Sequence, residues 1–330
     1  MKNIKLNRLK QILRKCRGVN IAVIGDVMID KFIWGKVSRI SPEAPVPVVN
    51  VTYESTHLGG AANVSNNIAG LGGNPLLFGV VGDDSAGNDL EKLLDTKKFD
   101  KRGIIIDEKR PTTMKTRIIA QDQHVVRADF ESTMEINRSV QKKLLDSLKG
   151  MISELNGIVI QDYNKGVLTK SLIKSIIELA NENKCPVVVD PKFQNFFEYK
   201  KVALFKPNIL ETQNALGFSL DIDERVNLAG KMLLEKLGCE NVLITRGSAG
   251  MSLFLSNGEE KRVPTKARKV HDVSGAGDTV ISTIVMILAA GGDIVEAATI
   301  ANHAAGVVCG EVGIVSITED KIIESFNNDK

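Results

Sequence analysis

Short, uninterrupted apolar runs recur along the chain and alternate with segments of helical periodicity. The runs are rich in β-branched residues, which is typical of strands buried on both faces of a sheet. The predicted strands are residues 20–24, 76–81, 104–106, 157–160, 186–189, 202–205 and 242–245. The predicted helices between them are residues 61–71, 85–94, 139–148, 172–181, 210–216 and 224–237. Strands that alternate with helices predict a layered α/β fold with a mostly parallel central sheet.

Two segments, residues 32–55 and 112–131, break this alternation. Polar and apolar residues alternate along them with a period of two, which is typical of antiparallel strands with one exposed face. We predict a small antiparallel sheet that projects from the main fold. Because exposed sheets are usually covered, it would serve as a lid over the substrate, as a homodimer interface, or as both. Two hairpins without such a role are the alternative.

The N-terminal segment, residues 1–17, is basic and carries apolar residues at helical spacing. It lacks the continuous apolar core of a signal peptide, so we expect a helix packed on the domain, with a membrane-surface helix as the alternative. The apolar run at residues 280–290 has the length of a core helix and is too short to span a bilayer. We therefore expect a cytoplasmic protein.

Composition is ordinary for a globular protein, with 43% hydrophobic and 25% charged residues among 330. The formal net charge of +3 gives no reason to expect nucleic acid or a membrane as a partner. The four cysteines are far apart in sequence, which predicts reduced and mostly buried thiols rather than a metal site. Since no repeat or linker divides the sequence, we expect a single domain over residues 1–330, with the lid segments inserted in it.

The stretch VHDVSGAGDT, residues 270–279, carries the most specific candidate chemistry. It precedes the long apolar run, which indicates a loop that opens into a buried helix. The first N–H groups of such a helix lack internal partners, so the backbone of Gly275, Ala276 and Gly277 can bind a phosphate. Asp278, in the first turn, is suited to accept a proton from a hydroxyl that attacks a phosphoryl group. An aspartate that only favours the helix N-terminus is the alternative.

Polar residues also follow several predicted strands at their carboxyl ends, where ligands collect in open α/β sheets. Turn chemistry explains many of them equally well, but together with Asp278 they predict one active-site cleft. The candidates for binding sugar hydroxyls and neighbouring groups are Asp26, Asp30, Gly59, Gly60, Asn63, Asp162, Lys165, Asp190 and Lys192.

Two further strand ends indicate a nucleotide site. Asn208 and Glu211 lie three residues apart at the start of a predicted helix and could hold hydrated Mg²⁺. An N-cap with its capping-box partner explains the same pair, and both explanations can hold. The turn at residues 245–250, with Gly247 and Gly250, could lie against the phosphates or the ribose of a nucleotide. A glycine-rich hairpin without a ligand is the alternative.

The motifs GGAANV, residues 59–64, and DVSGAGDT, residues 272–279, occur in an order that identifies a family. They are similar to the N-terminal and C-terminal signatures of the ribokinase-like (PfkB) sugar kinases, and the resemblance extends over residues 25–317. It implies a ribokinase-like three-layer fold with a mostly parallel central sheet and a small antiparallel β lid. It also implies an ATP-dependent carbohydrate kinase.

Within this family the chain resembles the D-glycero-β-D-manno-heptose 7-phosphate kinases, through residues 38–49, 161–169, 190–192, 206–211 and 271–280. It departs from their more usual motifs at Gln161, Lys206 and Ser274, where Ser274 keeps a hydroxyl. The resemblance implies phosphorylation at the anomeric hydroxyl to the 1,7-bisphosphate, in the synthesis of ADP-heptose for the lipopolysaccharide core. Because no His-x-x-His motif follows the kinase motifs, it implies the kinase half and not the cytidylyltransferase domain that many relatives carry.

The resemblance further implies roles for individual residues. Asp278 would be the base, and Gly275, Ala276 and Gly277 would donate N–H bonds to the transferred phosphoryl group. Glu211 would hold Mg²⁺ through water, and Asp272 and Ser316 resemble a loop for a monovalent cation such as K⁺. ATP would be bound by Asn208, Ile209, Leu210, Glu211, Thr245, Gly247, Gly250 and Asn302. The sugar hydroxyls would be held by Asp26, Asp30, Gly59, Gly60 and Asn63, while the strand-end residues Asp162, Lys165, Asp190 and Lys192 are further substrate-binding candidates from the sequence pattern.

The phosphate of such a sugar requires cations. Arg39, Lys115, Arg117 and Arg127 lie on the predicted lid and are the candidates, although each also fits an ordinary surface charge.

Three alternatives remain open from the sequence. Another PfkB activity, on fructose, a hexose phosphate or a nucleoside, would share the chemistry and differ in the lid contacts. A catalytically inactive sugar-binding protein is disfavoured by the intact Asp278 and its glycines. A nucleotide-binding oxidoreductase is disfavoured because no Gly-x-Gly-x-x-Gly follows the first strand.

Overall fold

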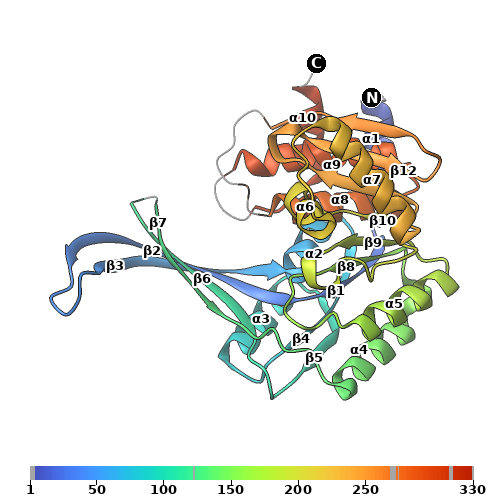
Figure 1. Cartoon of the computed structure of the whole chain (residues 1–330). Coiled ribbons are helices and arrows are strands. Elements are labelled where there is room, and N and C mark those ends of the chain that lie inside the picture. The colour runs from blue at the N-terminus through green and yellow to red at the C-terminus, as the bar shows by residue number, and fades with distance from the viewer. Residues whose placement is uncertain (1–3, 122, 268–272, 274, 312–314, 329–330) are drawn as a thin grey trace.

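A nine-stranded sheet, sheet A, forms the centre of the protein, and a four-stranded sheet, sheet B, projects from one side of it (Figure 1). The computed structural model describes residues 4–121, 123–267, 273, 275–311 and 315–328. Sheet A has the order β13-β12-β11-β10-β9-β8-β1-β4-β5, and its neighbouring strands are parallel except that β12 runs antiparallel to both β11 and β13. Its strands are β1 (Asn20–Gly25), β4 (Asn74–Val81), β5 (Asp100–Ile106), β8 (Gly157–Gln161), β9 (Val187–Asp190), β10 (Leu204–Phe205), β11 (Asn241–Thr245), β12 (Met251–Leu255) and β13 (Glu260–Val263).

Helices cover both faces of sheet A and complete three layers (Figure 1). Alternate residues of β1 enter two separate cores, Ile21 and Val23 on one face and Ala22 and Ile24 on the other, and all four are fully buried. One face is covered by α1 (Leu6–Lys15), α2 (Ala61–Gly70), α3 (Ser85–Thr96), α8 (Ala276–Ala289), α9 (Ile294–Cys309) and α10 (Glu319–Asn327). The other face is covered by α4 (Arg138–Met151), α5 (Lys170–Glu182), α6 (Ile209–Leu216) and α7 (Asp223–Leu237).

The layered α/β architecture and every predicted strand and helix are confirmed. The strands could be recognised because β-branched residues such as Val187, Val188 and Val189 are fully or almost fully buried in a two-sided core. The helix α1 buries Leu9 and Ile12 against the domain, as expected for residues 1–17. Among the described residues no helix combines the length and the apolarity needed to cross a membrane. All four cysteines are buried, as predicted.

Sheet B has the order β3-β2-β6-β7 and is the projecting sheet that the sequence predicts, named the lid for its expected role. Each hairpin is antiparallel, but β2 and β6 pair in parallel, so the sheet is mixed at its centre. The strand β2 begins earlier than predicted because Val27, Met28 and Ile29 are buried, which removes the period-two signal there. The strands are β2 (Val27–Ile40), β3 (Pro47–Gly60), β6 (Thr113–Ala120) and β7 (Gln123–Phe130).

Candidate active site

The first turn of α8 brings Asp278 to the carboxyl edge of sheet A. Gly275 is the N-cap residue and has a φ of 79°, in the left-handed region that favours glycine. No side chain caps this helix. In its first turn the Ala276 N–H donates to the Val273 carbonyl at 3.2 Å and the Thr279 N–H to the Gly275 carbonyl at 2.9 Å, while the N–H groups of Gly277 and Asp278 have no acceptor among the described residues and lie at the positive end of the dipole. The helix begins at Ala276, as the sequence predicts, and Asp278 is only 6% exposed.

Side chains from two other parts of the chain hold the Asp278 carboxylate. The Asn63 amide, on α2, donates to Oδ2 at 2.7 Å. The Tyr163 hydroxyl and the Gln161 amide donate to Oδ1 at 2.9 and 3.2 Å. Gln161 ends β8 and Tyr163 follows it, so one strand end and two helix starts, those of α2 and α8, meet at this carboxylate.

Burial raises the pKa of Asp278 to about 6. The Asn63 hydrogen bond opposes this shift, the negative charge of Asp190 adds to it, and Tyr163 and Lys206 oppose it. Burial also raises the pKa of Tyr163 well above its usual value, so this hydroxyl stays protonated and can donate to the carboxylate. The carboxylate is therefore ionised at neutral pH and has a pKa close enough to that pH to exchange a proton.

A second group of charges lies beside Asp278, at the ends of β9 and β10. The Lys206 ammonium is 3.0 Å from Oδ2 of Asp190, and both side chains are buried. Gln161 donates to this same Oδ2 at 3.3 Å and so joins Asp190 to Asp278. Lys192 forms an ion pair with Glu211.

The start of α6 lies next to this group. Asn208 is its N-cap, and its Oδ1 accepts from the Glu211 backbone at 2.8 Å while Glu211 Oε2 accepts from the Asn208 backbone at 2.8 Å. This is the capping box that the sequence allowed for. The end of β11 lies alongside, because Thr245 pairs with Asn208 and donates its N–H to the Pro207 carbonyl at 3.0 Å. Ile209 and Leu210 form the first turn, where Leu210 is exposed.

A cavity of about 260 Å³ opens between the first turn of α8 and the lid. Asp278 and three cations of the lid, Lys115, Arg117 and Arg127, line this cavity together. Its lining residues are Met28, Asp30, Phe32, Gly60, Asn63, Lys115, Arg117, Arg127, Tyr163, Gly275 and Asp278. The predicted base, the predicted sugar-binding residues Asp30, Gly60 and Asn63, and most of the predicted lid cations therefore face one space.

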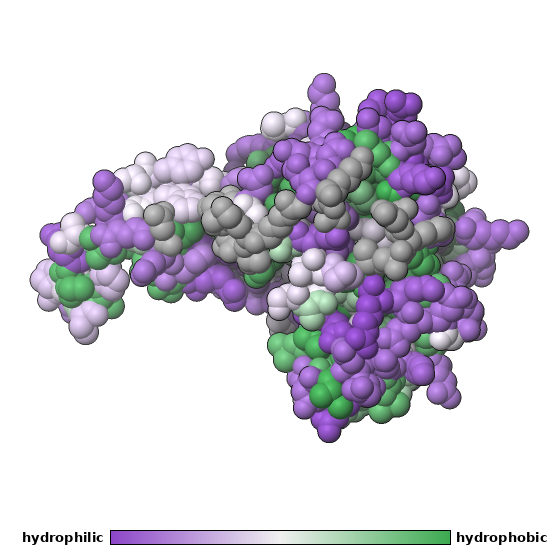
Figure 2. Space-filling model, turned by 90° about the horizontal axis from the view of Figure 1, so that it is seen from above, coloured by the Kyte–Doolittle hydropathy of each residue, from purple (hydrophilic) through white to green (hydrophobic). Residues whose placement is uncertain are grey.

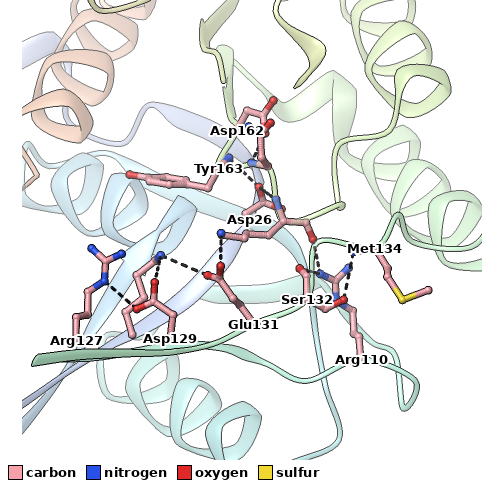
Figure 3. A network of polar contacts seen from close by, with 12 residues as sticks. Asp26, Arg110, Arg127, Asp129, Glu131, Ser132, Met134, Asp162 and Tyr163 are labelled. Atoms are coloured by element: carbon pink, nitrogen blue, oxygen red, sulfur yellow. Dashed lines mark hydrogen bonds and ion pairs between the residues drawn. The ribbon is translucent and has the colours of Figure 1, made fainter. Parts of the chain in front are cut away.

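Acidic side chains hold the lid cations in place (Figure 3). The Lys115 ammonium lies between Asp129 and Glu131, at 3.5 and 3.4 Å. Arg127 Nε is 2.9 Å from Asp129, and Lys165 is 2.6 Å from Glu131. Through these pairs the lid strand β7 is tied to the loop that follows β8.

Arg117 forms an ion pair with Asp30 inside the cavity. It also stacks over the Phe32 ring at 5.2 Å. Gly59 faces the same aspartate, because a Cβ at that position would lie 2.4 Å from Asp30 Oδ2.

Asp26 and Asp162, both predicted to bind the sugar, are instead engaged with the protein itself. Asp26 accepts backbone N–H bonds from Tyr163, Lys165 and Val167 at 2.8, 3.1 and 3.3 Å. Figure 3 shows Asp26 beside Tyr163. Asp162 accepts from the Tyr199 hydroxyl at 2.6 Å. Both are 1% exposed, and burial raises the pKa of Asp26 to about 6. Their place in the structure is to shape the loop that carries Tyr163.

Other predicted residues lie away from the cavity. Arg39 is exposed on the outer part of β2. Asn302 is buried and donates to the Pro264 carbonyl at 2.7 Å. Gly247 and Gly250 have φ values of 56° and 80° in the turn after β11, and a Cβ at Gly250 would lie 2.1 Å from the Val263 carbonyl oxygen.

The predicted monovalent-cation loop is only partly described. Asp272 lies outside the described residues, as does Ser274. Ser316 accepts a hydrogen bond from the Asn66 amide of α2.

A second cavity, of about 440 Å³, lies between α9, α10 and the residues after β13. His303 lines it and stacks on Phe326, with ring centroids 3.8 Å apart. The sequence offered no signal for this cavity, because its walls come from helices α9 and α10, which the hydrophobic pattern did not predict.

Gln161 and Tyr163 are the functional candidates that sequence reasoning missed. Both lie in the motif QDYNKG at the end of β8. In this motif the charged neighbours Asp162 and Lys165 were predicted to bind the substrate instead. Alternation along the end of β8 could have found them, because side chains two residues apart point to the same side of a strand.

Comparison with known proteins identifies the family of the chain. The pfkB family carbohydrate kinase profile matches residues 19–321. The chain is 42% identical over 308 residues to the bifunctional protein HldE of Geobacter sulfurreducens, covering 93% of this chain and 63% of that one. It is 44% identical over 305 residues to the HldE of Aliarcobacter butzleri, covering 92% of this chain and 64% of that one. The chain thus spans somewhat less than two thirds of these relatives.

Solved structures resemble the fold at low sequence identity. Phosphofructokinase-2 from Escherichia coli in complex with potassium has a TM-score of 0.77 and 18% identity, covering 94% of this chain and 99% of that one. Arabidopsis thaliana ribokinase with ribose and ATP has a TM-score of 0.73 and 17% identity, with the same coverage. The fold is therefore ribokinase-like. From the family match and the HldE relatives together, the chain belongs to the pfkB family of carbohydrate kinases.

Proposed function

We propose that this protein transfers the γ-phosphoryl group of ATP to the anomeric hydroxyl of D-glycero-β-D-manno-heptose 7-phosphate. The observation that carries the proposal is the cavity in which a buried carboxylate, Asp278, at an uncapped helix start faces the lid cations Lys115, Arg117 and Arg127. A phosphoryl acceptor that already carries a phosphate suits this arrangement, since one end requires a base and the other requires positive charge. The 1,7-bisphosphate would then serve the synthesis of ADP-heptose.

Asp278 would accept the proton of the attacking hydroxyl. Its hydrogen bonds from Asn63, Tyr163 and Gln161 fix the direction of the carboxylate, so little reorganisation is needed when substrate arrives. The N–H groups of Gly275 and Gly277 would stabilise the negative charge on the transferred phosphoryl group, joined by that of Ala276 once it leaves the Val273 carbonyl, to which it donates at 3.2 Å.

The phosphate of the sugar would lie at the lid. Lys115 and Arg117 are mostly buried, at 14% and 18% side-chain exposure, and each is held by carboxylates. Cations that are already desolvated and oriented bind a phosphate more strongly than flexible surface lysines. Arg39, on the exposed outer part of β2, is not part of this pocket.

The nucleotide would lie at the start of α6, beside the end of β11. Mg²⁺ keeps several of its waters when it binds a protein with phosphates, and the one carboxylate at the start of α6, Glu211, fits such an indirect contact. Both Glu211 oxygens already accept bonds, from the Asn208 backbone and from Lys192, so a direct bond to the ion is not required of it. When bound, Mg²⁺ would neutralise charge on the ATP phosphates.

The relatives support a heptose phosphate as the sugar, because at about 40% identity they are named HldE. A kinase for another phosphorylated sugar would use the same base and the same lid cations. The second activity implied by the word bifunctional is not part of the proposal.

A substrate panel with coupled ADP detection tests the proposal. Heptose 7-phosphate, fructose 6-phosphate, fructose, ribose and adenosine are compared at saturating Mg²⁺–ATP. We expect the highest kcat/KM for heptose 7-phosphate. A higher value for fructose 6-phosphate would contradict the choice of sugar. A higher value for an unphosphorylated sugar or for the nucleoside would also contradict the role of the lid cations, because they would then have no phosphate to bind.

We also propose that two copies of the chain associate through the lid. Figure 2 shows the lid as an arm with hydrophobic residues on its surface. Ile40, Tyr53 and Phe130 are about 60% exposed and lie on both hairpins. Sedimentation equilibrium of the wild type and of Tyr53→Glu tests this, with a dimer expected for the first and a weakened one for the second. A monomeric wild type would contradict it.

A further inference from the structure

Lys206 places a charged side chain at a buried position, directly after β10. Its backbone N–H bonds to the Val189 carbonyl at 2.9 Å, and the residue is only 2% exposed. Lysine is almost never fully buried unless it is paired. Its ion pair with Asp190, at 3.0 Å, satisfies that requirement but does not explain why a charge is there, because a buried ion pair contributes little net stability.

The position of the ammonium group relative to α8 supplies an explanation. A Cβ added to Gly277 would lie 3.8 Å from Lys206 Nζ and 3.6 Å from Asp190 Oδ2. The ammonium therefore lies directly beside the first turn of α8, where the uncapped N–H groups are. A lysine and a row of backbone donors next to one another form a site for an anion.

The donors of Lys206 are only partly used. An ammonium group has three N–H donors. Among the described parts of the chain, Asp190 is its one ion-pair or hydrogen-bond partner. Asp190 also accepts from Gln161, which in turn donates to Asp278, so the lysine is fixed in the same network as the base.

Lys192 approaches from the end of β9 but is arranged differently. Its ammonium group is paired with Glu211 and lies 5.7 Å from the centre of the Tyr163 ring. It therefore lies between α6 and Tyr163, and its charge also acts on Asp190 and Asp278. Of the two lysines, Lys206 is the one beside the helix start that carries Asp278.

We propose that Lys206 is a catalytic residue whose ammonium group donates a hydrogen bond to the phosphoryl group during its transfer. This inference rests on the proposed kinase function. In the step, the bond from phosphorus to the oxygen of ADP breaks and ADP leaves with the electron pair. A bond forms from phosphorus to the sugar oxygen, whose proton passes to Asp278. Lys206 keeps its proton throughout and, with the N–H groups of α8, stabilises the charge on the phosphoryl oxygens.

The test uses Lys206→Met, Lys206→Arg and the double variant Lys206→Met with Asp190→Asn, which leaves no unpaired charge buried. The double variant is compared with Asp190→Asn alone. Lys142→Met, on the exposed face of α4, is the control for the loss of a lysine. Turnover is measured at saturating ATP and sugar phosphate. Binding of ADP is measured by calorimetry with and without aluminium fluoride, which mimics the transferred phosphoryl group.

We expect turnover to fall about a hundredfold or more in Lys206→Met, and also in the double variant relative to Asp190→Asn, as for loss of a preorganised donor. The affinity for ADP alone should change less than about threefold, while the tightening by aluminium fluoride should be lost, since this donor acts on the transferred group. Lys206→Arg should retain part of both.

A double variant whose turnover and fluoride-dependent tightening lie within a few-fold of Asp190→Asn would overturn the role of Lys206. The proposed sugar substrate and the proposed role of Lys206 can be refuted independently of each other. If the wild type phosphorylates no sugar phosphate but its ADP binding is still tightened by aluminium fluoride and depends on Lys206, the sugar assignment is wrong and the role of Lys206 stands.

Discussion

Replacing Asp278 with asparagine should stabilise the protein at neutral pH while it removes the catalytic base. Burial raises the pKa of this carboxyl group from 3.8 to about 6. At about 1.4 kcal/mol per pKa unit, the ionised carboxylate lowers the free energy of unfolding by about 3 kcal/mol above pH 6. The asparagine is neutral, so this cost disappears.

Part of the gain is lost through the hydrogen bonds of the new amide. Asparagine can still accept at Oδ1 from Tyr163 and Gln161, but its NH₂ group would face the donor of Asn63, which now bonds Oδ2 at 2.7 Å. The loss of one hydrogen bond costs about 1 kcal/mol, which leaves a net gain of about 2 kcal/mol. For a chain of 330 residues this corresponds to a rise in Tm of about 3 °C.

The gain should depend on pH in a specified direction. The folded-state pKa of Asp278 lies above the unfolded-state value, so the folded protein binds the proton more tightly between about pH 4 and pH 6. The wild type therefore loses stability relative to the variant as pH rises through this window, and less than half of the gain should remain at pH 5.

Thermal unfolding of wild type and Asp278→Asn at pH 5 and pH 8 measures this, with Asp146→Asn on the exposed face of α4 as the control. A variant that melts at or below the wild-type temperature at pH 8, with a difference that does not change with pH, would refute the reasoning from burial.

Three other changes test separate parts of the structure. Tyr163→Phe removes a donor that lowers the pKa of Asp278, so the acidic limb of kcat/KM, expected near pH 6, should move to higher pH; an unmoved limb would count against it. Arg117→Met should raise KM for the sugar phosphate about 10- to 100-fold, with KM for ATP unchanged, and steady-state kinetics that show no such separation would exclude a phosphate contact. Gly25→Ala should lower the free energy of unfolding by about 2 kcal/mol or more in urea titrations, because its Cβ would lie 1.9 Å from a carbonyl oxygen of β8; near-wild-type stability would contradict that close approach.

The hydrophobic pattern predicted the parallel sheet because its strands are short, β-branched and buried on both faces. It did not predict α9, whose residues from Glu296 to Ala304 are buried without a break. A helix that is buried all round has no polar face and therefore no clear helical periodicity. The strand β13, with the sequence EKRV, is mostly polar and gives no strand signal.

The candidate site was predictable where the backbone itself carries the chemistry. The glycines before Asp278 indicated the helix start, and the capping-box spacing indicated the start of α6. The partners of each charge were not predictable, because they depend on how distant segments meet. Asp26 and Asp30 lie four residues apart in sequence, yet one holds three backbone N–H groups and the other holds Arg117.

Phosphorus NMR of the reaction of wild type and Asp278→Asn with heptose 7-phosphate and Mg²⁺–ATP tests the central claim most directly. For the wild type we predict a second sugar phosphate resonance, coupled to the anomeric proton, that grows in step with ADP. For the variant it should grow on the order of a hundredfold more slowly or not at all, as for loss of a general base. ADP formed without that resonance, or an unimpaired variant, would contradict the account of Asp278 as the base that activates the anomeric oxygen.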